Sequence, residues 1–142
     1  MFSKEESKQL RQDFWIAFGK SFPRKWILYD TKIKGLSLKF HFDLKIAMVS
    51  MDIETSDLEQ RIKLWEKLIA LRLILVNEYL SEAQFDDSFL LNNHKDISRI
   101  YVYKQSVSIH NKNTWRETME FLDHNMNLFE KFFREYEDII NG

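Results

Sequence analysis

Residues 114–140 read TWRETMEFLDHNMNLFEKFFREYEDII, and this stretch decides the fold. Apolar side chains recur in it at alternating spacings of four and three residues, which is the pattern of one continuous stripe along an α-helix. The stripe consists of Trp115, Met119, Leu122, Met126, Phe129, Phe133, Tyr136 and Ile140, and a second flank of Phe121, Leu128, Phe132 and Ile139. Because this face is wider than a coiled-coil seam, we expect both the domain and a partner to cover it.

The composition indicates a single domain over residues 1–142. The chain is 44% hydrophobic and has twelve phenylalanines, which is enough apolar surface to form a core without covalent cross-links. It has no cysteine, which excludes disulfides, zinc-thiolate sites and thiol nucleophiles. The four histidines are dispersed without metal-ligand spacing, and there is no Gly-rich phosphate loop, so we expect no cofactor.

Two further helices are expected upstream of residue 114. Ser3 and Glu6 form a capping-box pattern that opens a helix ending near Gly19. Ser56 and Glu59 form a second such pattern, which opens a helix through about residue 80. We expect one side of this second helix to carry Leu58, Ile62, Trp65, Ile69, Leu73, Val76 and Leu80, widened by Leu68, Leu71 and Leu75. Thr114 with Glu117 is the expected cap of the final helix.

Alternating apolar and polar residues predict strands between these helices. Segments 26–33, 36–42 and 45–53 indicate an antiparallel meander, and segments 97–103 and 106–110 indicate a second hairpin. The acidic stretch 81–96 is either a packed loop or a short strand. The predicted fold class is therefore α+β, with the order αβββαββα and a mainly antiparallel sheet packed against long amphipathic helices.

Charge is distributed unevenly along the chain. Residues 1–45 hold ten Lys and Arg against five Asp and Glu, residues 46–97 hold five against ten, and residues 98–142 hold six against seven. A basic first third can mark a nucleic-acid or partner surface, although an ordinary solvated surface explains it as well. The N-terminal residues lack an apolar signal core, and no run is long enough to span a bilayer, so we expect a cytoplasmic chain without membrane contact.

Four stretches of the chain carry a family resemblance: FWIAFG at 14–19, WILYDTKIKG at 26–35, ISRIY at 97–101 and VSIHNKNTW at 107–115. Together they resemble domain-of-unknown-function family 4268, a bacterial family. The resemblance runs along nearly the whole chain and implies no established activity. Longer relatives carry a similar segment after a nuclease-like domain, so the resemblance implies a DNA-linked or defence setting.

Acidic residues at strand ends raise the question of a metal site. Helix, three strands, helix, strand is also the order of the restriction-endonuclease-like core, in which acids and an acid-x-Lys triplet hold a divalent ion. Asp43, Asp52 and Glu54 are the weak metal candidates here. No lysine stands two residues after Asp52, so the triplet is absent and solvated strand-end acids are the simpler interpretation.

A polar cluster before the last helix is the strongest binding signal. Asn111, Lys112, Asn113 and Arg116 stand where backbone donors and the helix dipole favour an anion, and Arg24, Lys25 and Arg99 join them if the hairpin ends are adjacent. The alternative is that Asn113 and Thr114 only cap the helix while Trp115 packs on the sheet.

These patterns favour a non-catalytic protein-interaction module that forms a homodimer in the bacterial cytoplasm and takes a protein partner. The alternative is a degenerate or atypical restriction-endonuclease-like protein that contacts nucleic acid. The arrangement of Asp43, Asp52 and Glu54 discriminates between the two readings, because a metal site requires these carboxylates to converge.

Overall fold

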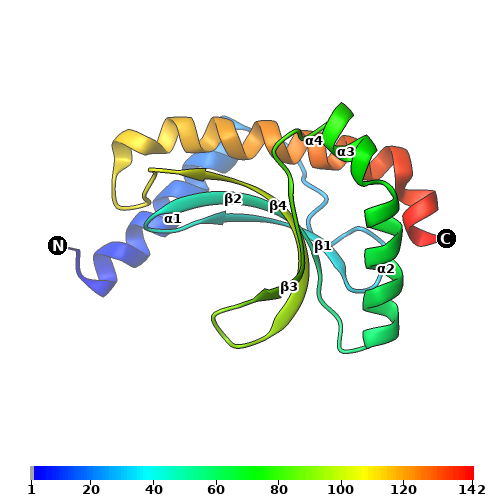
Figure 1. Cartoon of the computed structure of the whole chain (residues 1–142). Coiled ribbons are helices and arrows are strands. Elements are labelled where there is room, and N and C mark those ends of the chain that lie inside the picture. Colours follow the sequence, from blue (N-terminus) through cyan, green and yellow to red (C-terminus); the bar gives the residue numbers. More distant parts are fainter. Residues whose placement is uncertain (1) are drawn as a thin grey trace.

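A computed structural model describes residues 2–142. Its elements are α1 Lys4–Ser21, β1 Leu36–Phe42, β2 Ile46–Ile53, α2 Leu58–Ala70, α3 Arg72–Glu78, β3 Gln84–Leu90, β4 Asp96–Gln105, the 3-10 helix η1 Lys112–Thr114 and α4 Trp115–Asn141. The strands form one antiparallel sheet in the order β1-β2-β4-β3. The predicted α+β class is confirmed, and Figure 1 shows that the sheet curls with the helices along its outer side.

Helix α4 supplies much of the core, as its sequence predicts. Phe129, Phe132 and Phe133 are fully buried, while Trp115, Met119 and Tyr136 are partly buried at the edge of the core. The helix packs against β1, β2 and β4. The sheet side of this core includes Leu38, Val49, Met51, Ile100 and Val102. The fold itself absorbs most of the broad apolar face of α4, and Ile139 stays exposed.

The first helix is capped as predicted. The Ser3 side chain accepts from the Glu6 backbone, and the Glu6 side chain accepts from the Ser3 backbone. Its buried Phe14 contacts Phe42 of β1, and its buried Phe18 contacts Phe40 of the same strand. This aromatic cluster holds α1 against the same side of the sheet as α4.

Two predicted strands are absent from the described residues. Segment 26–33 is a loop, because Leu28 and Lys32 have φ values of 46° and 65°, a left-handed backbone that no strand accommodates. Segment 106–110 is a turn that begins at Ser106, whose φ is 63°. Stretch 81–96, which the sequence left open, contains β3. Alternation within a short segment did not reveal these left-handed positions.

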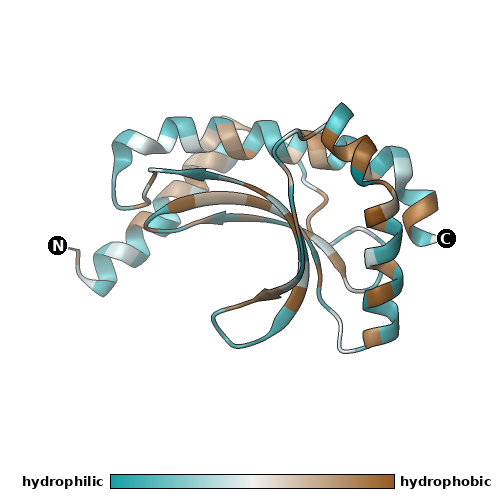
Figure 2. Cartoon of the chain, viewed as in Figure 1, coloured by the Kyte–Doolittle hydropathy of each residue, from teal (hydrophilic) through white to brown (hydrophobic). Residues whose placement is uncertain are grey.

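The predicted helix over 56–80 is two helices that break at Leu71, whose φ and ψ are −97° and 5°. Its cap is Asp57, which accepts from Gln60, so the predicted Ser56 cap is wrong. The buried positions are Leu64, Leu68, Leu71, Leu75 and Leu80. On the apolar side predicted for this helix, Leu58, Ile62, Ile69 and Leu73 are exposed, by 63, 48, 38 and 73%. Figure 2 shows apolar bands along the length of α2 and α3.

The final helix also begins differently from the prediction. Thr114 has helical dihedral angles and caps nothing with its side chain. Instead, η1 precedes α4, and the Asn111 side chain accepts from the Asn113 backbone at its start. Thr114 Oγ1 donates to the Ser108 and Asn111 carbonyls and thereby ties the preceding turn to the helix. None of the helices in residues 2–142 has the length and apolar character needed to cross a membrane.

Candidate functional site: a charge network on the open face of the sheet

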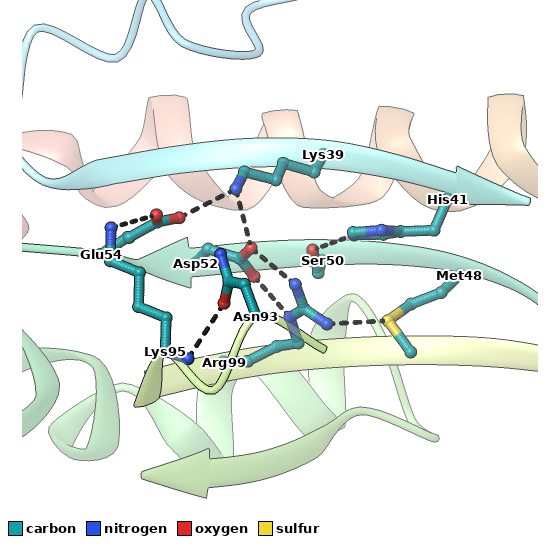
Figure 3. Close-up of polar contacts among 9 residues, drawn as sticks. All are labelled: Lys39, His41, Met48, Ser50, Asp52, Glu54, Asn93, Lys95 and Arg99. Carbon is teal, nitrogen blue, oxygen red and sulfur yellow. Dashed lines mark hydrogen bonds and ion pairs between the residues drawn. The ribbon is translucent and has the colours of Figure 1, made fainter. Parts of the chain in front are cut away.

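Strand alternation gathers mostly polar side chains on the sheet face turned away from α4. They are Ser37, Lys39 and His41 on β1, Met48, Ser50 and Asp52 on β2, and Arg99, Tyr101 and Tyr103 on β4. We call this the open face, because Figure 1 shows no helix against it in the described part of the chain. Figure 3 shows several of these side chains pointing toward one another from the three strands.

The centre of the open face is an ion pair between Asp52 and Arg99. These residues stand opposite each other in β2 and β4. Arg99 donates from Nε at 2.8 Å and from Nη2 at 2.9 Å, one bond to each carboxylate oxygen. Asp52 is 0% and Arg99 5% exposed, so both charges are removed from water. Because desolvation offsets much of the attraction in such pairs, this one fixes the relative position of two side chains more than it adds stability.

Lys39 extends the network from the neighbouring strand. Its Nζ lies 3.5 Å from Asp52 and 3.1 Å from Glu54, and Lys95 Nζ lies 2.6 Å from the other Glu54 oxygen. Hydrogen bonds from Lys95 and Lys39 lower the pKa of Glu54. Burial alone lowers the pKa of Lys39, but its bond to Glu54 and the nearby negative charges raise it overall. Both groups therefore stay charged near neutral pH.

His41 is the neutral member of the open face. Its Nε2 shares a hydrogen bond of 2.9 Å with Ser50 Oγ. Burial, followed by the positive charge of Arg99, lowers the pKa of His41 to about 4. The imidazole is therefore uncharged at physiological pH and can use its second nitrogen as donor or acceptor.

A pocket of about 270 Å³ adjoins this network, between the β1-β2 turn and the β3-β4 hairpin. Its wall includes Arg99, whose guanidinium carbon lies 4.4 Å from the centre of the Phe89 ring. Arg99 Nη1 lies 3.7 Å from the sulfur of Met48. The remaining wall residues are His41, Asp43, Ile46, Met48, Leu90, Leu91 and Asn92.

The structure places the predicted anion-binding residues in three separate regions. Arg24 donates to Asn127 and Glu130 on α4 and lies 4.0 Å from the Trp26 ring centre. Arg24 and Lys25 line a cleft of about 590 Å³ beside α4. Arg99 lies instead on the open face, on the opposite side of the sheet.

The third region is the start of α4. Lys112 lies over Trp115, with Nζ 5.6 Å from the ring centre, and Arg116 is an exposed side chain 3.7 Å from Glu120. Asn111 and Asn113 form the turn of η1. Asn127, the partner of Arg24, is about 16 Å further along the helix axis than Arg116. The predicted residues thus form one group of Asn111, Lys112, Asn113 and Arg116, a second of Arg24 and Lys25, and Arg99 alone.

The three weak metal candidates do not converge, because Asp43 lies apart while Asp52 and Glu54 share Lys39. Asp43 accepts from the Lys45 and Ile46 backbones and shapes the β1-β2 turn, at the far end of the strand from Asp52. Asp52 is bound by Arg99, and Glu54 by two lysines. Within residues 2–142 no group of three His, Asp or Glu side chains is arranged to hold a metal ion.

A sequence model described as "Domain of unknown function (DUF4268)" matches residues 10–137. The chain belongs to this family. The curated proteins and the solved structures that were compared with it gave no match. The DUF4268 match spans both the open face and the exposed stripe of α2 and α3, so each is a feature of the family segment in this chain.

Sequence reasoning missed most of the open-face network. It named Asp52, Glu54 and Arg99 but assigned Arg99 to a different cluster and did not select Lys39, His41 or Lys95. The alternation of β1 placed Lys39 and His41 on one face, and that signal was available. The register that sets Asp52 opposite Arg99, across 47 residues of sequence, could not be predicted from the sequence.

Proposed function

We propose that this DUF4268 chain is a non-catalytic protein-interaction module that forms a homodimer through α2 and α3. The observation that carries the proposal is the exposure of Leu58, Ile62 and Ile69 along one face of α2, followed by exposed Leu73 on α3 beyond the break at Leu71. Single exposed apolar side chains are ordinary on soluble proteins, but a contiguous stripe marks an interface. A DNA-linked or defence setting in the bacterial cytoplasm is part of the proposal, and the cysteine-free composition and the resemblance to longer relatives support it.

The edges of the sheet favour a helical interface over strand pairing. At the β1 edge, the Leu38 backbone already donates to the Leu28 carbonyl, so the 26–33 loop covers part of the strand. At the β3 edge, the register shifts between Asp86 and Phe89. Interrupted and covered edges resist pairing with another strand. The α2-α3 stripe is therefore the better surface for self-association.

The charges beside the stripe support a second copy as the occupant. Lys63 and Glu66 are both exposed and stand three residues apart on α2, along the same flank of the stripe. When two such helices pack antiparallel about a two-fold axis, Lys63 of one copy faces Glu66 of the other, twice. The apolar stripe and its flanking charges are thus self-complementary.

Sedimentation velocity at tens of micromolar tests this proposal. The unmodified chain should sediment as a dimer, and Ile62→Glu combined with Leu73→Glu should give a monomer with an unchanged circular dichroism spectrum. Ile16→Glu is the matched control, because Ile16 is 57% exposed on α1, away from the stripe. A monomeric unmodified chain, or a dimer that survives the double substitution, would reject the interface.

A second candidate is an atypical restriction-endonuclease-like protein that contacts nucleic acid. Its support is Lys39, whose Nζ lies 3.1 Å from Glu54 and 3.5 Å from Asp52. Lys39 thus brings to these acids, from the neighbouring strand, the lysine that the sequence lacks two residues after Asp52. Against it, Arg99 occupies both oxygens of Asp52, and two strands rather than three separate α1 from α2. The interaction module therefore remains the preferred function.

Incubation with plasmid and single-stranded DNA in magnesium or manganese separates the two candidates. The interaction module predicts no cleavage. Cleavage that Glu54→Gln abolishes and Glu59→Gln leaves intact would favour the nuclease candidate, because Glu59 is an exposed acid on α2 outside the network.

A further inference from the structure

The pocket beside Arg99 has the features of a small-ligand site. It measures about 270 Å³ and lies between two turns of the sheet, away from the α2-α3 stripe. Three of its wall residues, His41, Met48 and Arg99, are drawn in Figure 3 and point over the same part of the open face. The wall thus combines a buried charged side chain, an imidazole and apolar groups, which is the usual composition of a ligand pocket.

Arg99 supplies an underused donor to this pocket. Its Nε and Nη2 are bound to Asp52, whereas the partner of Nη1 is the Met48 sulfur at 3.7 Å. A thioether is a weak acceptor, so an oxygen at the same position would make a stronger bond. Arg99 is only 5% exposed, and bulk water therefore competes little for this donor.

His41 adds a second polar contact without adding charge. Ser50 occupies its Nε2, and the ring also lines the pocket. The charged groups that face the ring are Arg99, Asp52, Lys39 and Asp43, two of each sign. This balance matters for ligand choice, because a further full negative charge beside Asp52 and Asp43 would be repelled.

We propose that this pocket binds an uncharged planar ligand in which a carboxamide is attached to an aromatic or apolar group. The carbonyl oxygen accepts from Arg99 Nη1 in place of the Met48 sulfur, and the amide nitrogen faces His41. The apolar body contacts Phe89, Met48 and Leu91. The site goes beyond the proposed homodimer and stands independently of it.

Titration with benzamide and benzoate, followed by two-dimensional amide NMR of the full chain, tests the proposal. Benzamide should shift signals confined to segments 41–48 and 89–99, with a Kd on the order of 1 mM for a ligand of this size. Benzoate, which has nearly the same shape and a negative charge, should bind at least about tenfold more weakly.

Variants then distinguish a specific site from non-specific binding to an apolar surface. His41→Leu should weaken benzamide binding about tenfold, while His124→Leu, at an exposed position on α4, should not change it. Arg99→Met with Asp52→Leu replaces the buried pair by apolar groups of similar volume, which such pairs tolerate, and should remove the preference for benzamide over benzoate. Equal or tighter benzoate binding, no binding at 10 mM benzamide, or shifts outside the pocket would overturn the proposal.

Discussion

Arg99 on β4 holds Asp52 on β2 in a bidentate ion pair, and both side chains are buried on the sheet face that carries no helix. Around this pair, Lys39 and Lys95 neutralise Glu54, and His41 binds Ser50. Every buried side-chain nitrogen and oxygen in residues 2–142 has a hydrogen-bond partner. The open face is therefore a satisfied polar network, and removing one member leaves another without its partner.

Breaking the central pair from one side should be costly. Asp52→Ala leaves the Arg99 guanidinium buried and uncompensated, so we expect the free energy of unfolding to fall by about 3–5 kcal/mol. Urea unfolding followed by circular dichroism measures this loss. Lys95→Ala is the control, because its side chain is 51% exposed and such a pair contributes less than about 1 kcal/mol. Equal effects of the two substitutions would contradict the account.

Stability should rise with pH between 5 and 7 because of His41. Its pKa is near 6.5 in the unfolded chain and about 4 in the folded protein, so the unfolded state binds more protons across this window. The expected gain from pH 5 to pH 7 is about 2 kcal/mol. Urea unfolding at both pH values measures it, and His41→Leu should flatten the difference. An unchanged difference in that variant would show that another group titrates.

Gly35 should not tolerate a side chain. Its φ is 86°, and an added Cβ would lie 3.1 Å from the Cβ of Thr55. Gly35→Ala should therefore lower the free energy of unfolding by about 1 kcal/mol or more. Gly19→Ala is the matched control, because Gly19 lies in α1 with no atom within 4 Å of the new Cβ, and should raise stability by about 0.5–1 kcal/mol. Calorimetry measures both, and effects of the same sign would contradict the prediction.

Glu130 should anchor the 22–35 loop to α4. Its Oε2 accepts from the Ile27 backbone at 2.7 Å and its Oε1 binds Arg24, while the residue is 6% exposed. Glu130→Ala leaves a buried backbone N–H unpaired, so we expect a loss of about 1–3 kcal/mol in chemical unfolding. Glu135→Ala, an exposed neighbour on the same helix, should change stability by less than about 0.5 kcal/mol. If Glu130→Ala also changed stability by less than about 0.5 kcal/mol, the proposed role of Glu130 as an anchor would be contradicted.

The sequence predicted the long-range architecture where one pattern persisted over many residues. The stripe of α4 and the capping box of Ser3 and Glu6 are both found. Local backbone geometry was harder, because the left-handed Leu28 and the break at Leu71 leave no signature in apolar spacing. In α2 and α3 two apolar faces compete, and spacing alone does not say which one meets the core.

The candidate site was harder to predict from the sequence than the fold. Residues of the open face come from three strands, and only the register brings Lys39, Asp52 and Arg99 together. The sequence analysis instead grouped Arg99 with Arg24 and Arg116 on the expectation that the hairpin ends are adjacent, and these residues lie in different regions. Composition records how many charges a chain has, whereas pairing depends on topology.

The proposed interface can be tested most directly by a distance measured between two copies. The chain has no cysteine, so Ala70→Cys, at the exposed last residue of α2, introduces one attachment point for a spin label next to the α2-α3 stripe and leaves the Lys63 and Glu66 charges in place. Pulsed electron paramagnetic resonance should then give one narrow intermolecular distance, which disappears on dilution with unlabelled protein, and the same label at Ile16→Cys on α1 should give a longer one. The absence of any intermolecular coupling for the Ala70→Cys label at tens of micromolar would contradict the homodimer through α2 and α3.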